Sequence, residues 1–407
     1  MSVCQNNLRF SNVRAECEES GLIVSHFIIR MSTATPNTGA QPPNHEHAFN
    51  KSVKVAKVVI VGSLNLDFIN LIDSHPASGS HVQANDDVEA PGGHGGNQAV
   101  ACARLSALPL ASTIRRLLQP DEPLPSGPAM DVFMNGAIGD QDDFGERIVA
   151  ELKKNKVNTT GIFTIKGEKT GYAHINVDAQ GTSSVTGRAK ANAKCLPGPA
   201  LKLDVEPDVV LVQLEIPQET VKHVLAWAKG HNAITICNAA PATRTVAPEI
   251  FDVDHFILNE EQADKLDGIK TVLFNNRSNQ RDEIRQHYLT QCAEFHKLGA
   301  KCVVITLAEL GAVGSVRESG VAKRYIFDAV QVESKKVEDT TGGSDAFIGA
   351  YTVEIVHQWQ LGMKQDVGSA MEMGIKAAGL CVSRVGSMQG IPTVKEILTT
   401  EFRAVDI

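Results

Sequence analysis

The feature of the sequence that most constrains the fold is a regular alternation of short β-branched runs with longer segments of helical spacing. Between residues 208 and 307, the apolar runs 209–214 and 303–307 enclose the helical patterns 218–229 and 282–298. Short, continuously apolar strands that alternate with helices are typical of a parallel sheet covered on both faces. The sequence therefore predicts an α/β fold, a doubly wound parallel-sheet domain with helices on both faces.

The same alternation continues towards the N-terminus, with predicted strands at 58–62 and 132–139 and an amphipathic helix at 140–154. A weaker pattern of exposed strands, at 82–90 and in a hairpin over 171–185, predicts a small β-sheet outside the main fold. We therefore expect one large domain, about residues 55–400, that carries this small sheet at one side.

The composition limits the class of protein. With 407 residues, 43% of them apolar, the chain can bury a large core. The net charge of −8 and the lack of a basic block argue against nucleic acid as a partner. No stretch is apolar over the length of a membrane span, so we expect no membrane partner. None of the eight cysteines forms a C-x-x-C pair, which argues against a zinc site or a disulfide framework and favours the reducing cytoplasm or nucleus.

Two segments fall outside this pattern. Residues 1–54 are predicted to be a disordered N-terminal extension, because residues 32–50 are rich in Thr, Asn, Pro and His. The apolar run 21–29 is short and follows acidic residues, so a signal peptide is not indicated, and we hypothesise that Met31 is the true start. Residues 108–131 contain five prolines and are predicted to be a surface insertion.

Polar residues recur directly after the predicted strands. The carboxyl ends of parallel strands lie at one edge of the sheet, where ligands of open α/β sheets bind. Asn65 and Asp67, two residues apart, can face one side and offer a hydroxyl-rich ligand both donors and acceptors, although a polar turn would have the same residues. The full set is Asn65, Asp67, Glu215, Asn238, Asn259 and Thr306.

A glycine-rich loop at residues 91–97, Pro-Gly-Gly-His-Gly-Gly-Asn, leads into a segment of helical spacing. Four glycines within five positions let a ligand come close to the backbone. Asn97 is placed to contact that ligand, whereas a single histidine such as His94 is more often a solvated loop residue.

A second glycine-rich turn, residues 339–345, also leads into a helical pattern. Unpaired N–H groups and the helix dipole make such an N-terminus attractive to anions, and Gly342 and Gly343 leave room for a phosphate. The same dipole favours the ionised form of Asp345. An anion cradle beside a base is what phosphoryl transfer to a hydroxyl requires, although an ordinary capped turn would have the same residues.

Together these stretches resemble the ribokinase-like, or pfkB, family of carbohydrate kinases. The N-terminal signature of the family is matched at residues 62–67 and 91–99, and the C-terminal signature at residues 339–347. The resemblance covers about residues 56–395 and rests on two signatures in the expected order. Shorter matches lie at residues 213–215, 238–242, 258–261 and 382–386.

The resemblance implies ATP-dependent phosphorylation of D-ribose to D-ribose 5-phosphate. Asp345 would be the general base, and residues 342–345 would form the anion hole. A lid at about 68–90 and 170–187 would close over the sugar, exclude water and serve as the contact of a homodimer. The implied sugar-binding residues are Asn65, Leu66, Asp67, Gly93, His94, Gly95, Gly96, Asn97, Glu215 and Asp345.

The resemblance also implies three cofactors: ATP, Mg²⁺ and K⁺. Magnesium would bridge the nucleotide phosphates, mostly through water. Potassium would lie beside the anion hole, bound largely by backbone carbonyl groups of Asp339, Thr341, Cys381, Arg384, Gly386 and Gly390. The implied ATP-binding residues are Asn259, Thr306, Leu307, Ala308, Glu309, Leu310, Gly311, Gly342, Gly343 and Ser344.

Four residues near the implied site depart from the family pattern: His94 for lysine, Ser344 for glycine, Gln262 for the glutamate of Asn-x-x-Glu, and Ala308 for glycine. Gln262 lacks the charge that would organise magnesium, and Ser344 would crowd a phosphate if its φ were positive. Two alternatives therefore stay open, a kinase for another sugar or a nucleoside and a catalytically weakened sugar-binding protein. A Rossmann dehydrogenase is disfavoured because no G-x-G-x-x-G turn follows the first strand.

Overall fold

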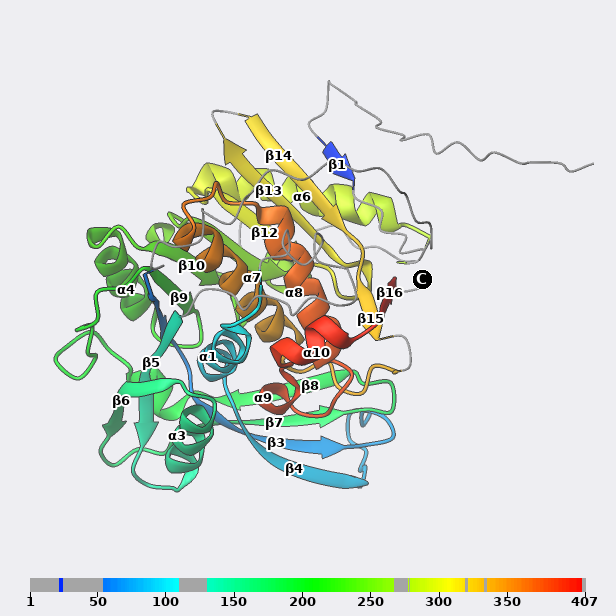
Figure 1. Ribbon diagram of the computed structural model, residues 1–407. Helices are drawn as coiled ribbons and strands as arrows, with labels where there is room; N and C mark the ends of the chain where they lie inside the picture. Colours follow the sequence, from blue (N-terminus) through cyan, green and yellow to red (C-terminus); the bar gives the residue numbers. More distant parts are fainter. Residues whose placement is uncertain are drawn as a thin grey trace, which may run out of the picture.

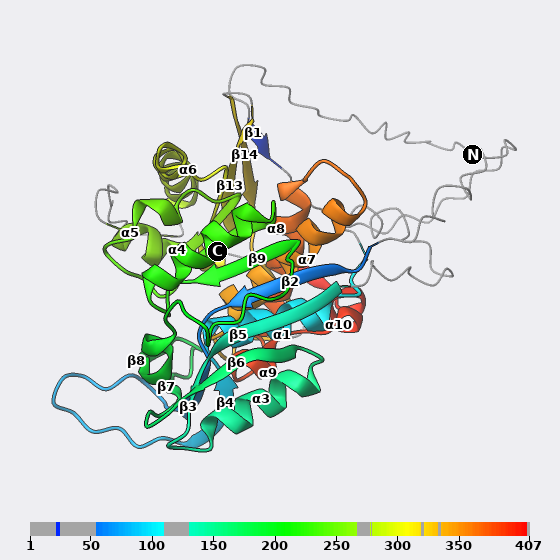
Figure 2. The same ribbon diagram turned by 90° about the vertical axis from the view of Figure 1, so that its left-hand side faces the viewer.

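The computed structural model describes residues 54–109, 130–266, 277, 279–318, 321–332 and 335–404, and the backbone of residues 22–24. Figure 1 shows a large twisted sheet with helices packed against it and a small sheet along the bottom of the view. Figure 2, turned by 90°, shows the same small sheet below the main one.

The large sheet has the strand order β1-β14-β13-β12-β11-β10-β9-β2-β5-β6. Every pair from β6 to β12 is parallel, which confirms the predicted parallel sheet. β13 is antiparallel to both neighbours, because the connection 307–311 is too short for a crossover helix. The strands are β1 (Leu22–Val24), β2 (Ala56–Val61), β5 (Met130–Gly139), β6 (Asn158–Ile165), β9 (Val209–Gln213), β10 (Ile234–Asn238), β11 (His255–Asn259), β12 (Cys302–Thr306), β13 (Ala312–Glu318) and β14 (Val321–Phe327).

Helices cover both faces of this sheet, as predicted. Val58 and Ile60 of β2 belong to the core under α1 (His94–Leu105), α7 (Gly343–Gln360) and α8 (Val367–Cys381), whereas Val59 and Val61 belong to the core under α4 (Gln218–Gly230) and α6 (Arg281–Leu298). Smaller elements are α3 (Phe144–Lys154), α5 (Glu260–Lys265), α9 (Ser387–Gly390), α10 (Val394–Thr399), three 3-10 helices, η1 (Lys190–Lys194), η2 (Pro248–Ile250) and η3 (Ala308–Leu310), and the pair β15 (Val330–Val332) and β16 (Phe402–Ala404).

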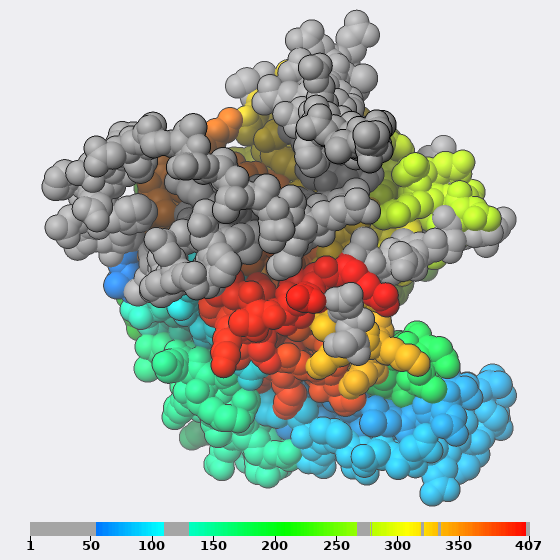
Figure 3. Space-filling view, turned by 45° about the vertical axis from the view of Figure 1, so that its right-hand side comes forward, coloured from blue at the N-terminus to red at the C-terminus, as the bar shows by residue number. Residues whose placement is uncertain are grey.

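The small sheet has the order β4-β3-β7-β8 and confirms the predicted small sheet outside the main fold. Asn65 and Asp67 lie on its first strand rather than in a turn, because pairing with β4 and β7 extends over the whole segment from Asn65 to Leu71. Figure 3 shows its N-terminal strands, in blue, below the C-terminal segment in red. The strands are β3 (Asn65–Leu71), β4 (Asp86–Gly92), β7 (Gly171–Val177) and β8 (Ser183–Arg188).

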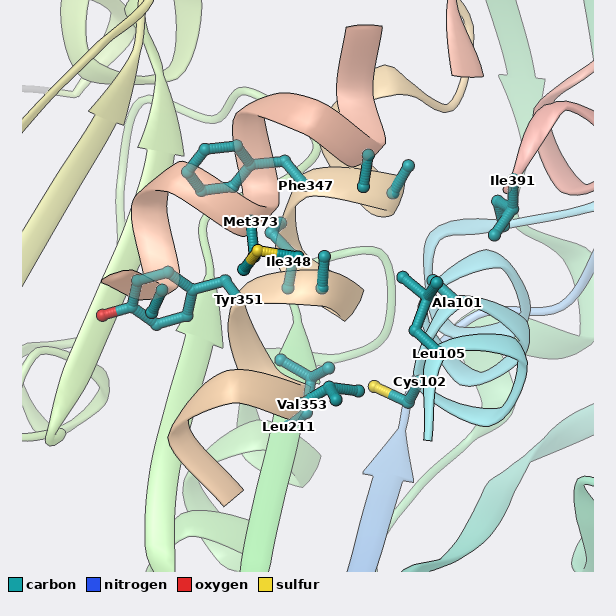
Figure 4. Close-up of a cluster of buried hydrophobic side chains, with 14 of the residues drawn as sticks. Ala101, Cys102, Leu105, Leu211, Phe347, Ile348, Tyr351, Val353, Met373 and Ile391 are labelled. Atoms are coloured by element: carbon teal, nitrogen blue, oxygen red, sulfur yellow. The ribbon is translucent and has the colours of Figure 1, made fainter. Parts of the chain in front are cut away.

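Close packing of α1 against α7 brings the two glycine-rich loops together. In Figure 4, Ala101 and Cys102 of α1 point toward α7, and Met373 of α8 lies beside Ile348 of α7. A Cβ atom on Gly349 would overlap the side chain of Ala101, so glycine permits this close approach. The N-termini of α1 and α7 therefore lie side by side.

The segments predicted to lie outside the domain are only partly described. β1, within the predicted disordered extension 1–54 and before Met31, pairs in parallel with β14. The edge of β14 offers unpaired backbone groups to this apolar run. In the predicted insertion 108–131, residues 110–129 lie outside the described part, and residues 130–131 already belong to β5.

Two further properties follow from the described ranges. None of the helices there has the length and apolar character needed to cross a bilayer. The six cysteines there, at positions 102, 195, 237, 292, 302 and 381, are buried and unpaired.

Candidate active site

Asp345 lies in the first turn of α7, where its buried carboxylate accepts hydrogen bonds from three side chains. Asn97 Nδ2 donates to Oδ2 over 2.9 Å, and Gln98 Nε2 donates to Oδ1 over 2.8 Å. His94 Nδ1 lies 3.1 Å from Oδ1 and 3.3 Å from Oδ2. All three partners come from the first turns of α1, so the two glycine-rich loops meet at one carboxylate.

Gln98 holds this carboxylate from the core side. Its Nε2 also donates to Asn238 Oδ1 over 3.0 Å, and its Oε1 accepts from Gln213 Nε2 over 2.6 Å. Gln98, Gln213 and Asn238 are all buried, so the network fixes the orientation of Asp345. Asn238 was predicted at the ligand-binding edge of the sheet, but Gln98 and Gln213 were not, although amide side chains inside apolar runs are a signal of such a network.

Asn65, at the start of β3, and Glu215, just after β9, form the side of the site next to the small sheet. Asn65 Nδ2 donates to Glu215 Oε1 over 3.0 Å, and Ser63 Oγ donates to Glu215 Oε2 over 2.5 Å. Asn192 orients Asn65, because its Nδ2 donates to Asn65 Oδ1 over 2.8 Å. Ser63 and Asn192 were not predicted, and Asn192 lies in the short helix η1, which has no periodic signal.

Asp67 faces the same side of β3 as Asn65. Its buried carboxylate accepts a hydrogen bond from Ser387 Oγ over 3.0 Å. Burial raises the pKa of Asp67 to about 7; the hydrogen bond from Ser387 opposes this shift, and repulsion from Glu215 adds to it. Asp67 can therefore be either ionised or protonated near neutral pH. Ser387, at the start of α9, was not predicted as a site residue.

Leu66, between these two residues, was predicted to contact the sugar. It is fully buried, and because side chains alternate along a strand it points to the opposite face of β3. Its side chain therefore faces away from those of Asn65 and Asp67.

His94 is the first residue of α1, and its side chain is 28% exposed. Burial lowers its pKa, but the carboxylates of Asp345, Glu215 and Asp67 outweigh this effect and raise the pKa of His94 to about 9. The imidazole is therefore a cation at neutral pH. The interpretation of His94 as a solvated loop histidine is wrong, because close packing of α1 and α7 places it against Asp345.

The chain is closely packed around the two glycines at the N-terminus of α7. Gly342 is the N-cap with φ +80°, and a Cβ atom there would lie 2.7 Å from Ser387 Cα. A Cβ atom on Gly343 would lie 2.8 Å from Val382 Cγ1. Ser344 is helical and is not among the described non-glycine residues with positive φ, so the crowding expected for a positive φ does not arise.

The residues predicted to hold a monovalent cation come from two neighbouring segments, 339–341 and 381–390. Asp339 Oδ1 accepts from Thr341 N over 2.8 Å, and Asp339 Oδ2 accepts from Gly386 N over 2.9 Å. The Cys381 thiol contacts the Thr341 carbonyl group over 4.0 Å, and a Cβ atom on Gly390 would lie 3.0 Å from the Cys381 carbonyl oxygen.

Thr341 Oγ1 in this loop is buried, with no hydrogen-bond partner among the described residues. An orphan hydroxyl among backbone carbonyl groups fits a large monovalent cation better than a transition metal. Arg384 belongs to the loop through its backbone, because its N–H donates to the Cys381 carbonyl oxygen and its side chain pairs with Glu396 over 2.7 Å.

On the predicted nucleotide side, Asn259 is the N-cap of α5. Asn259 Oδ1 accepts from Gln262 N over 2.8 Å, and Gln262 Oε1 accepts from Asn259 N over 2.9 Å, which together form a capping box. Arg277 links this turn to the next loop, because it pairs with Glu260 over 2.8 Å and with Glu309 over 2.7 Å. Arg277 was not predicted, since its role depends on two loops that are distant in the sequence.

The loop 306–311 turns sharply after β12. Leu307 and Leu310 are buried in the core, so their side chains do not face a ligand and the loop would bind one through its backbone. Gly311 has φ +89°, and a Cβ atom there would overlap the carbonyl oxygen of Phe327. Ala308 has φ +50°, a conformation that glycine adopts more easily.

The other predicted glycines lie at the start of α1. Gly93 is the N-cap with φ +86°, and Gly95 and Gly96 are buried in the first turn. Asn97 Oδ1 is buried beside them with no hydrogen-bond partner among the described residues. This orphan acceptor is available for a ligand hydroxyl.

Comparison with known proteins identifies the class of protein to which this fold and site belong. Residues 55–394 match the pfkB family of carbohydrate kinases, and the chain belongs to this family. It is 30% identical to the ribokinase of Bacillus subtilis (strain 168) over 343 residues, which cover 84% of this chain and 97% of that protein. It is 27% identical to the ribokinase of Staphylococcus aureus (strain COL) over 348 residues, with 84% and 98% covered.

Solved structures show the same fold. The structure of Arabidopsis thaliana ribokinase complexed with ribose and ATP superposes with a TM-score of 0.65 at 24% identity, covering 85% of this chain and 98% of that one. The protein is thus a sugar kinase of the ribokinase type, a phosphotransferase with an alcohol group as acceptor.

Proposed function

We propose that the protein transfers the γ-phosphoryl group of ATP to the 5-hydroxyl group of D-ribose, giving D-ribose 5-phosphate and ADP. The observation that carries the proposal is the position of Asp345, whose buried carboxylate lies directly after the glycine-rich N-cap of α7 and beside Asn97. A base next to an anion-binding helix terminus supports transfer of a phosphoryl group to a hydroxyl.

Recognition of the sugar would use the polar groups beside the small sheet. Asn65, Asp67 and Glu215 offer carboxylate and amide groups to the sugar hydroxyls, and the orphan Asn97 Oδ1 offers a further acceptor. Several hydroxyl contacts would fix the ring so that one hydroxyl lies at Asp345.

In the chemical step, the 5-hydroxyl group gives its proton to Asp345 as its oxygen bonds to the γ-phosphorus. The bond between that phosphorus and the bridging oxygen of ADP breaks at the same time. Backbone N–H groups of residues 342–344 would stabilise the charge on the transferring group, because unpaired N–H groups at the start of α7 favour anions.

Three bound groups would complete the site. ATP would bind along the backbone of residues 306–311 and near Asn259. Mg²⁺ would neutralise the phosphates while bound mainly by the nucleotide and water, because Gln262 supplies an amide instead of a carboxylate. K⁺ would fix the loop around Asp339 and Thr341, where the orphan hydroxyl of Thr341 supports such a site.

The small sheet would act as the lid and as the contact of a homodimer. Val88, Ile69, Ile175 and Val185 form one row across its four strands. The two central residues are buried, but Val88 is 37% and Val185 is 59% exposed. A second copy of the chain would cover these exposed ends.

A coupled assay of ADP release across ribose, fructose, adenosine and 2-keto-3-deoxygluconate tests the proposal. Ribose should give the highest kcat/KM in the presence of Mg²⁺ and K⁺. A higher kcat/KM for another compound would favour a different kinase of the family. Ribose binding by calorimetry without turnover of any compound would favour a weakened sugar-binding protein.

A further inference from the structure

His94 lies across the open side of the catalytic carboxylate. Its Nδ1 is nearly equidistant from the two oxygens of Asp345, at 3.1 and 3.3 Å. Asn97 is 4% exposed and Gln98 is fully buried, whereas the His94 side chain is 28% exposed. Among the three donors to Asp345, His94 is therefore the one on the solvent side.

The two amide donors cannot leave the carboxylate easily. Gln98 is held by Gln213 and by Asn238, and Asn97 is enclosed in the first turns of α1. Among the described residues, the ring of His94 is hydrogen-bonded to Asp345 alone. His94 is therefore the donor that an incoming acceptor hydroxyl can displace from Asp345.

The charges of the site hold His94 in place when no sugar is bound. Three carboxylates face the imidazole: Asp345 from α7, Asp67 from β3 and Glu215 from the end of β9. They outweigh the effect of burial and raise its pKa to about 9, so a charge-assisted hydrogen bond joins imidazolium and carboxylate at neutral pH.

We propose that His94 blocks the base Asp345 until a sugar hydroxyl displaces it, and so prevents water from serving as the phosphoryl acceptor. The proposal rests on the proposed kinase function. A sugar offsets the lost contact through its other hydroxyls at Asn65, Asp67 and Glu215, whereas a water molecule has no such groups. The free energy of binding the other sugar hydroxyls would thus favour the sugar over water as the phosphoryl acceptor.

The reaction that His94 suppresses is ATP hydrolysis at the same site. A water molecule would give one proton to Asp345 while its oxygen bonds to the γ-phosphorus, and ADP would leave with the bridging oxygen. The products are ADP and inorganic phosphate, and Asp345 later returns its proton to solvent. His94 keeps its own proton throughout.

The test compares ADP release with and without saturating ribose in the wild type, His94→Ala and His94→Gln, with His223→Ala as the control. His223 is an exposed histidine on α4 and is not among the residues assigned to the site. We expect ribose-free hydrolysis to rise about tenfold in His94→Ala, equivalent to about 1.4 kcal/mol in the barrier. His94→Gln, which keeps a donor without the charge, should fall between, and His223→Ala should match the wild type.

Two further readouts separate this role from a structural one. His94→Ala should bind ribose several-fold more tightly by calorimetry, because no contact has to be displaced. Wild-type hydrolysis without ribose should rise as the pH passes about 9, where His94 loses its charge, and hydrolysis by His94→Ala should not show this rise.

Unchanged ribose-free hydrolysis in His94→Ala, with ribose phosphorylation intact, would overturn the proposal. Loss of both activities in that variant would also overturn it, because His94 would then be needed to orient Asp345. If the proposed kinase function is wrong, the result can be distinguished from these outcomes, because the wild type itself would not phosphorylate ribose.

Discussion

Ala308 occupies a backbone conformation that alanine rarely adopts, with φ +50° in the loop after β12. The left-handed region costs an L-residue about 1–2 kcal/mol, and glycine avoids this cost but loses more entropy on folding. We predict that Ala308→Gly raises the free energy of unfolding by about 0.5–1 kcal/mol. Thermal and denaturant unfolding measure this change.

The control for this prediction is Gly311→Ala in the same loop. Because a Cβ atom at Gly311 would overlap Phe327, this variant should lose more than about 1 kcal/mol of stability. A lower stability of Ala308→Gly would show that the positive φ is not the dominant cost at this position.

Gln262 forms the capping box with Asn259, and glutamate can make the same two hydrogen bonds. Gln262→Glu should therefore keep α5 intact while adding a charge beside the phosphate side of the site. We predict that it lowers the Mg²⁺ concentration for half-maximal activity by several-fold. An unchanged magnesium titration would mean that the missing charge has no role in binding the metal.

At the scale of single residues, the sequence could predict those that belong to a short, recognisable sequence pattern. Asn65, Asp67, Asn97, Glu215 and Asp345 lie in glycine-rich loops or just after strands, where a short pattern reveals them. Asn192 and Ser387 were not predicted, because their side chains bond to Asn65 and Asp67, which are distant from them in the sequence. The contact of His94 with Asp345 could not be predicted, because the two residues lie 251 positions apart in the sequence.

The N-terminus of α7 is the element on which the proposed chemistry depends. Gly342→Ala would place a methyl group 2.7 Å from Ser387 Cα and force alanine to φ +80°. We predict that kcat falls about 10²–10³-fold, the usual effect of a lost oxyanion donor, while ribose affinity changes little. Steady-state kinetics and calorimetry measure the two effects separately.

Gly362→Ala is the matched control for this variant. Gly362 also has positive φ, at +64°, but a Cβ atom there has no neighbour within 4 Å. It should lose some stability and keep its kcat. An equal loss of kcat in both variants would contradict a specific role for the start of α7.

Element prediction succeeded where burial gives a simple pattern. The strands β2, β9, β10 and β12 are mainly apolar and buried, because both of their faces are covered. β3 was not predicted as a strand, since Asn65 and Asp67 interrupt its apolar pattern with polar side chains. The antiparallel direction of β13 could not be predicted, because the direction of a strand after a short loop depends on which strand it pairs with.

At the scale of the whole molecule, the exposed ends of the apolar row on the lid predict a dimer. Val185→Glu would place a charge at the proposed contact, on a residue that is 59% exposed. We predict that the wild type sediments as a dimer and the variant as a monomer at micromolar concentration. Val321→Glu, at a residue 69% exposed on β14, is the control and should stay dimeric.

Two results of this experiment would contradict the proposed contact. The first is a wild type that sediments as a monomer across the concentration range. The second is a Val185→Glu variant that remains a dimer, which would place the interface elsewhere.

The central claim is that Asp345 serves as the base for phosphorylation of ribose. The most direct measurement follows the reaction of ribose with ATP by phosphorus NMR, with wild type and with Asp345→Asn. The wild type should accumulate ribose 5-phosphate, and the variant should lose about 10³-fold in kcat while binding ribose nearly as well. Absence of ribose 5-phosphate from the wild-type reaction, or turnover retained by Asp345→Asn, would contradict the claim.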